Sequence, residues 1–227
     1  MTSGFLDTAR SGRTVWTRLS SIWTKSAPHP NEEGGERVSS RENQVSPVGK
    51  VEYDGEYATL TFSRRVGHPA EDVWSAITDP EQLKSWYMTR AIITNGKGGS
   101  IDFISGPSHF HVTGRILRWD PPHLFEHEWN VAPRPELPSG EKSVVRWELA
   151  RDGEGTRITL VHQRLTRRTA TGFAPGIHAF LDRLATQLSG EPIPDWRGRV
   201  EELHKHYPSS WRASPSGNPS ELNKQGA

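Results

Sequence analysis

The chain has 227 residues, of which 33% are hydrophobic, and a formal net charge of +1. This charge balance gives no electrostatic reason to expect nucleic acid or an anionic membrane as a partner. The absence of cysteine excludes disulfides, thiolate metal sites and thiol nucleophiles, and no apolar run approaches the roughly 18 residues of a membrane span or marks a secretory signal. We therefore expect a cytoplasmic protein without a membrane span.

The first 50 residues differ in composition from the rest of the chain. Residues 1–25 are rich in Ser, Thr and Arg, contain Asp7 as their single acid and carry a weak helical stripe between Val15 and Trp23. Three interpretations stay open: a marginal amphipathic helix that forms a functional extension, a targeting peptide, or upstream sequence read from a misassigned start. Residues 27–49 are too polar to bury much apolar surface, so we expect residues 1–50 to be disordered or weakly helical.

Clear periodicity begins near residue 51. Alternation over residues 57–64 predicts a strand, and a helix is expected to follow from Pro69, a residue that suits a first helical turn. The run Thr78-Asp79-Pro80-Glu81 ends this helix and caps a second short one over residues 80–87.

Only strands are predicted after these helices, until one final long helix. The predicted strands cover residues 100–104, 109–119, 123–129, 143–151 and 156–165, with a bend or bulge at Gly114, and the helix covers 174–189. Consecutive strands without intervening helices pair antiparallel, so the final helix must cover the open face of an α+β domain over residues 51–190. In the C-terminal extension, 191–227, Pro192 and Pro194 precede one short helix within 195–207 and then a disordered tail.

Four segments resemble a known family. They are VWSAITDPEQLKSWY (73–87), GRILRWDPPHLFEHEW (114–129), VVRWELARDGEGTRITLVHQRL (144–165) and GIHAFLDRLATQLSGEP (176–192). In this order they resemble the activator-of-Hsp90-ATPase-homologue branch of the SRPBCC, or START-like helix-grip, superfamily. One departure is Ile177, where members of the family commonly carry Trp.

The resemblance implies a helix-grip fold: a curved antiparallel sheet wrapped around a long C-terminal helix, with two short helices after the first strand. It also implies a cavity that receives lipids, polyketides or other apolar compounds. We therefore expect the protein to bind a small hydrophobic molecule between sheet and helix. Two alternatives stay open: a cyclase, dehydratase or hydrolase that uses a cavity histidine, and a co-chaperone-like interaction module whose partner is a chaperone or a second copy of this chain.

Two histidines are the candidate polar groups of the cavity. Strand alternation places His127 on the face of Phe125 and Trp129, and His162 on the face of Ile158 and Leu160. Because the apolar members face the core, both imidazoles should face it too. They could orient a ligand or act as general acid and base, or each could simply hydrogen-bond a neighbour in the core.

Aromatic residues are expected to form the walls of the cavity. The resemblance places one mouth of the cavity at the end of the second short helix, where Trp86 and Tyr87 lie. Trp129, Trp147 and Phe180 are predicted to line the interior. Plain packing in the core is the alternative for each of them.

No cofactor is expected. His109 and His111 point the same way on a strand and could begin a metal site, but a surface pair is the simpler interpretation. Arg164, Arg167 and Arg168 form a basic run in a predicted loop ahead of the long helix. A solvated loop is the simpler interpretation here, and contact with a carboxylate-bearing ligand is the alternative.

Overall fold

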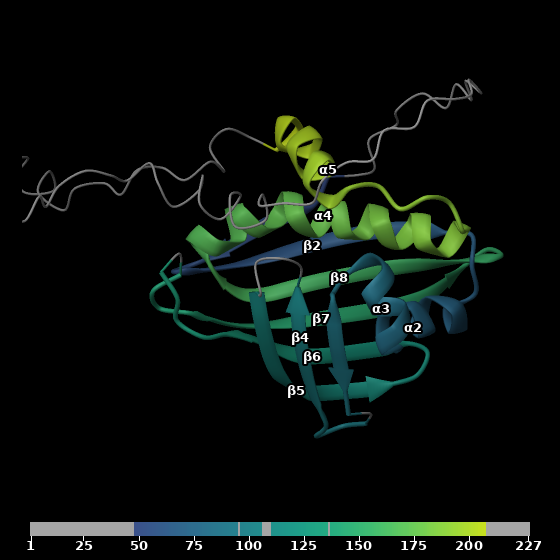
Figure 1. Cartoon of the computed structure of the whole chain (residues 1–227), viewed down its shortest axis with the longest axis horizontal. Coiled ribbons are helices and arrows are strands. Elements are labelled where there is room, and N and C mark those ends of the chain that lie inside the picture. Colours follow the sequence, from purple (N-terminus) through teal and green to yellow (C-terminus); the bar gives the residue numbers. More distant parts are fainter. Residues whose placement is uncertain (1–47, 95, 106–109, 136, 208–227) are drawn as a thin grey trace, which may run out of the picture.

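A single antiparallel sheet and one long helix organise the molecule (Figure 1). The computed structural model describes residues 48–94, 96–105, 110–135 and 137–207. The strands are β1 (Lys50–Asp54), β2 (Tyr57–Val66), β3 (Arg90–Ile93), β4 (Ser100–Ser105), β5 (Phe110–Asp120), β6 (Leu124–Val131), β7 (Glu141–Asp152) and β8 (Gly155–Thr166). The helices are α2 (Ala70–Thr78), α3 (Pro80–Trp86), α4 (Arg167–Ser189), α5 (Trp196–Leu203) and the 3-10 turn η1 (His204–His206).

Within the described residues the eight strands pair in the order β1-β2-β8-β7-β6-β5-β4-β3, and α4 lies over one face of the sheet (Figure 1). This arrangement confirms the predicted α+β helix-grip fold. No helix in the described ranges is long and apolar enough to cross a membrane. The predicted extension over residues 1–50 and the tail from Pro208 lie largely outside the described residues.

The junction between α2 and α3 forms where the sequence predicts a cap. The Asp79 carboxylate accepts the backbone N–H groups of Glu81 at 2.8 Å and Gln82 at 3.4 Å, which satisfies two donors at the start of α3. The Trp86 indole N–H donates to the Ala76 carbonyl at 3.0 Å and so joins the end of α3 to α2. The two short helices are thus held as one unit beside α4.

Two strands were not predicted, β1 and β3, and both lie at the edges of the sheet. β1 is mostly exposed and β3 has only four residues, so neither shows a clear alternation of apolar and polar positions. The two short helices consequently follow the second strand and not the first.

The long helix begins earlier than predicted. α4 starts at Arg167, because Thr166 caps it by accepting the backbone N–H of Thr169 at 3.3 Å. The sequence TATGFAPG argues against a helix by propensity, but burial of Thr169 and Ala170 against the sheet outweighs propensity here. The basic run is therefore not a loop: Arg164 lies in β8 and Arg167 and Arg168 form the first turn of α4.

On the concave face of the sheet, residues paired across neighbouring strands form rows of side chains. His127 pairs with Val145, which pairs with His162, which pairs with Leu60. All four side chains are buried, as are those of the neighbouring row Phe125, Trp147, Leu160 and Phe62. The inward direction predicted for both histidines is therefore correct.

The C-terminal segment packs on the outside of α4. Arg199 Nε lies 2.9 Å from Asp182 Oδ2, and Leu203 and Tyr207 are buried. The Trp196 indole N–H donates to the Gly176 carbonyl at 3.3 Å, and its ring lies 5.3 Å from that of Phe180. α5 falls inside the range where a short helix was predicted, and it supports the helix side of the pocket described next.

Candidate functional site

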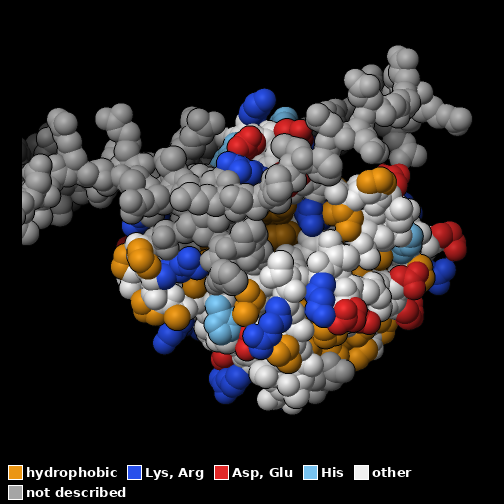
Figure 2. Space-filling model, viewed as in Figure 1, with side chains coloured by type: hydrophobic (Ala, Val, Ile, Leu, Met, Phe, Trp, Pro, Cys, Tyr) orange, Lys and Arg blue, Asp and Glu red, His pale blue; other side chains and the backbone are white. Residues whose placement is uncertain are grey.

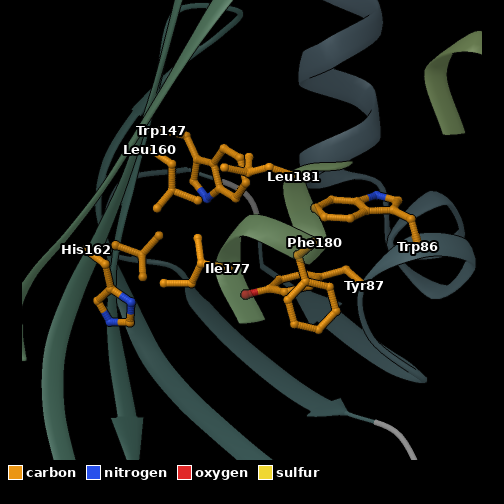
Figure 3. Close-up of a pocket in the computed structure, with 9 residues that line it drawn as sticks. Trp86, Tyr87, Trp147, Leu160, His162, Ile177, Phe180 and Leu181 are labelled. Atoms are coloured by element: carbon orange, nitrogen blue, oxygen red, sulfur yellow. The ribbon is translucent and has the colours of Figure 1, made fainter. Parts of the chain in front are cut away.

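A pocket lies between α4 and the concave face of the sheet (Figure 3). Its residues come from three places: Val145, Trp147, Leu160 and His162 from the sheet, Ile177, Phe180 and Leu181 from α4, and Trp86 and Tyr87 from the end of α3. Five of the seven residues predicted to contact a ligand are brought together here. His127 and Trp129, the other two, lie next to this space without lining it.

The pocket is almost filled by its own side chains. The remaining space is about 20 Å³, enough for roughly one water molecule. Sites for drug-sized ligands usually enclose about 300–1,000 Å³. The side chains of α4 and the sheet thus occupy the region where a cavity was expected.

Aromatic rings form most of the pocket wall. The Trp86 and Tyr87 rings stack with centroids 4.9 Å apart, and the Phe180 ring meets Tyr87 edge-on at 4.6 Å. Trp147 closes the wall from the sheet, 6.5 Å from Trp86. Trp86 is fully buried with its N–H bonded to Ala76, so it serves packing and lines the pocket at once.

The His162 imidazole is fixed by Ser143, a residue that was not singled out from the sequence. Its Nε2 lies 2.8 Å from Ser143 Oγ, and the Ser143 hydroxyl donates to the Trp129 carbonyl at 3.1 Å. Burial lowers the pKa of His162 to about 3, so the ring is neutral at pH 7. Alternation along β7 with Val145 and Trp147 was the signal that could have placed Ser143 on this face.

The second inward histidine is held by its own strand. His127 Nδ1 lies 2.9 Å from the carbonyl oxygen of Glu128. Burial lowers the pKa of His127 to about 4, against a smaller opposing effect of that hydrogen bond. Both imidazoles on the concave face are therefore uncharged at neutral pH.

The Trp129 ring lies near both histidines and near Tyr87 of the pocket. Its ring centroid lies 6.1 Å from His127, 5.8 Å from His162 and 6.2 Å from Tyr87. The indole N–H of Trp129 is buried and has no hydrogen-bond acceptor in the part of the chain that the structure describes. The Tyr87 phenol has no hydrogen-bond partner among the described residues, and burial raises its pKa above the usual value.

His111, one of the two residues considered as possible metal ligands, does not line the pocket. His111 is exposed and its Nε2 lies 3.0 Å from Asp102, while His109 lies outside the described residues. No group of three metal-ligating side chains occurs in the part of the chain that the structure describes. The face shown in Figure 2 carries both acidic and basic side chains, with most of the acidic ones toward the right of the view.

Comparison with known proteins places this architecture in a family. The family described as "Activator of Hsp90 ATPase homolog 1-like protein" matches residues 67–189, more than half of the chain. The chain belongs to this family. A search of curated proteins finds no match.

Several solved structures share the fold of this chain. CalU16 from Micromonospora echinospora is 22% identical, with a TM-score of 0.55 over 73% of this chain and 96% of its own. Protein MLL2253 from Mesorhizobium loti is 23% identical, with a TM-score of 0.54 over 59% of this chain and 98% of its own. A Bordetella parapertussis protein is 22% identical, with a TM-score of 0.54 over 75% of this chain and 94% of its own. At these identities the likeness shows the fold alone.

Proposed function

We propose that this member of the family binds a small, largely apolar molecule between α4 and the concave face of the sheet. The observation that carries the proposal is an aromatic pocket wall beside a buried polar group, the Trp129 indole N–H, that has no hydrogen-bond acceptor among the described residues. A buried polar group left unpaired costs about 1–3 kcal/mol. A ligand that pairs with such groups recovers this free energy, which makes the site suited to binding.

Binding requires side chains to move, because the free space is only about 20 Å³. Ile177 and Phe180 are the partly buried residues that α4 contributes to the pocket, whereas Leu181 is buried. Phe180 rests on Trp196 of α5, so a shift of this ring is coupled to the C-terminal segment. We expect the ligand to displace Ile177 and Phe180 and to leave the sheet side unchanged.

The two imidazoles favour binding over catalysis. The pKa of His127 is about 4 and that of His162 about 3, whereas a general acid or base works best with a pKa near the working pH. Neutral rings of this kind accept hydrogen bonds well and transfer protons poorly at pH 7. The enzymatic alternative would require the ligand itself to shift these pKa values upward.

A co-chaperone role is less well supported by the described surface. Among the described residues, the exposed large hydrophobic side chains are those of Val48, Tyr53, Tyr57 and Ile92. Tyr53 and Tyr57 lie on β1 and β2 and Ile92 lies on β3, at opposite edges of the sheet. They therefore form no common apolar face for an ATPase partner.

Native mass spectrometry of the protein purified from cells tests the proposal. We expect a mass excess that disappears after denaturation and that names the ligand by its mass. The variant Ile177→Phe should lose this excess, because the added atoms fill the remaining space. Ile92→Phe is the matched control, since Ile92 is 44% exposed at the edge of the sheet. A clean unliganded mass for the wild type, together with no uptake of added apolar compounds, would overturn the proposal.

A further inference from the structure

The hydrogen-bond partners of the two buried histidines assign their protons. The carbonyl of Glu128 can only accept, so His127 Nδ1 carries the proton and Nε2 is left as an acceptor. The single Ser143 proton goes to the Trp129 carbonyl, so His162 Nε2 must donate to Ser143 Oγ. His162 Nδ1 is then an unprotonated nitrogen that can only accept. Neither His162 Nδ1 nor His127 Nε2 has a donor among the described residues.

Donors without acceptors lie around the same space. Among the described residues the buried Trp129 N–H has no acceptor, and the Tyr87 O–H and the Trp147 N–H, which belong to the pocket lining, form no hydrogen bond. Figure 3 shows the Tyr87 oxygen directed toward the space beside Ile177. Natural interiors leave few buried polar groups unpaired, so the Trp129 N–H needs an explanation. Unpaired donors and unpaired acceptors together call for a partner that can both donate and accept.

The chemistry of the site also excludes charge on that partner. None of the nine residues that line the pocket is an acid, a lysine or an arginine. Moving a carboxylate or an ammonium group out of water without a counter-charge costs several kcal/mol. Arg183 of α4 is not part of the pocket lining, and its guanidinium donates to the Trp86 and Pro194 carbonyls.

We propose that the ligand is an uncharged molecule with a ring-shaped apolar body and a hydroxyl group, and that the hydroxyl donates to His162 Nδ1 while accepting from the Trp129 N–H or the Tyr87 O–H. This inference rests on the proposed binding function and specifies the class of ligand. The apolar body lies against the aromatic wall of Trp86, Phe180 and Trp147. The space of about 20 Å³ that the side chains leave is close to the size of one hydroxyl group.

The strand pairing gives the distance between the two histidines that one ligand could contact. His127 and His162 both pair with Val145, so one strand separates them and their Cα atoms are about 10 Å apart. A second hydroxyl or carbonyl group at the far end of a two-ring body could therefore reach the neighbourhood of His127. A single-ring ligand would use only His162.

The test compares three probes with the same ring system: naphthalene, 2-naphthol and 2-naphthoate. Their affinities for the full-length protein are measured by tryptophan fluorescence at about pH 7. We expect 2-naphthol to bind about tenfold or more tightly than naphthalene, because one hydrogen bond to an otherwise unpaired buried group has about this effect. We expect 2-naphthoate to bind more weakly than either neutral probe.

A matched pair of variants locates the effect. His162→Leu should remove the preference for 2-naphthol over naphthalene. His123→Leu is the control, because His123 is exposed between β5 and β6. Should His162→Leu fail to fold, the ring 15N shifts of His162 in the wild type give the same answer, since 2-naphthol must perturb the Nδ1 resonance.

The outcomes separate the two proposals. Equal affinity for naphthalene and 2-naphthol, or tightest binding of 2-naphthoate, would overturn the inference about the hydroxyl group and leave apolar binding intact. Failure of all three probes to bind, with a clean unliganded native mass, would overturn the binding function itself. A preference for 2-naphthol that persists in His162→Leu would show that another group provides the contact and would contradict the assignment to His162.

Discussion

Ser143 Oγ lies 2.8 Å from His162 Nε2, and this hydroxyl also donates to the backbone carbonyl of Trp129. The serine therefore joins β7 to both of its neighbours, β6 and β8, inside the sheet. It also decides which nitrogen of His162 faces the pocket. Ser143 therefore stabilises the sheet and also determines which nitrogen of His162 can accept a hydrogen bond from a ligand.

Ser143→Ala should destabilise the fold and disturb the His162 ring. Removing the hydroxyl leaves the buried N–H of His162 unpaired and takes one donor from the Trp129 carbonyl, which together cost about 1–3 kcal/mol. Urea unfolding followed by tryptophan fluorescence measures this change. Ser63→Ala is the control, because Ser63 is exposed on β2 and should change the free energy of unfolding by less than about 0.5 kcal/mol. Equal effects of the two variants would contradict the role given to Ser143.

Stability should fall on mild acidification. Burial lowers the pKa of His127 to about 4, of His162 to about 3 and of His178 to about 4, from the ordinary 6.5. The unfolded chain therefore binds protons below pH 6.5 that the folded protein does not. Protonation of these rings therefore does not affect the free energy of unfolding above pH 6.5. As the pH falls from 6.5 toward 4, that free energy decreases by up to about 1.4 kcal/mol per pH unit for each ring.

The free energy of unfolding, measured in urea at several pH values between about 7 and 5, checks this expectation. His162→Gln should make the pH dependence shallower than that of the wild type, because one of the three proton uptakes is gone. His123→Gln should keep the wild-type slope, since its side chain is exposed in the folded protein. A His162→Gln slope identical to that of the wild type would show that His162 is not buried as a neutral ring.

Gly114→Ala should be strongly destabilising. A Cβ at this position would lie well inside van der Waals contact with the Glu128 carbonyl oxygen, in the part of the β5–β6 pairing that precedes the register shift between Ile116 and Arg118. The two strands would have to separate, and overpacking of this kind costs about 1–3 kcal/mol. The same carbonyl accepts from His127 Nδ1, so the orientation of that ring should change as well.

Thermal unfolding compares Gly114→Ala with Gly67→Ala. A Cβ at Gly67 meets no atom within 4 Å and the backbone there is not left-handed. Gly67→Ala should therefore be neutral or slightly stabilising, since alanine restricts the unfolded chain. A melting temperature of Gly114→Ala equal to that of the wild type would mean that the close approach of β5 to Glu128 is absent in solution.

Tyr207→Phe should loosen the C-terminal segment. The Tyr207 hydroxyl accepts the Gly49 N–H at 3.4 Å and lies 2.9 Å from His178 Nδ1, so it joins the start of β1 to α4. Loss of this oxygen leaves both buried groups without that partner, at a cost of about 1–3 kcal/mol. Hydrogen exchange of the Gly49 amide should rise in Tyr207→Phe and stay unchanged in Tyr57→Phe, whose side chain is 50% exposed.

The directions of the inward side chains followed from the sequence. A strand has a period of two residues, so once Phe125 and Trp129 are assigned to the core, His127 must face it as well. The same reasoning placed Trp147 and His162 correctly, and Asp79 before Pro80 fixed the start of α3 through local hydrogen bonds. The direction of a strand side chain and a helix cap both depend on residues that are close in the sequence, so the sequence is enough to predict them.

Tertiary structure alone decided what those inward residues can do. The start of α4 at Arg167, against the propensity of its first turns, depends on burial of two residues of those turns, Thr169 and Ala170, against the sheet. The size of the pocket depends on how Ile177 and Phe180 pack against the sheet. The proton positions on both imidazoles depend on a serine one strand away and on a backbone carbonyl. Each is set by contacts between segments distant in sequence, because packing and hydrogen-bond geometry follow from three-dimensional proximity and not from residue order.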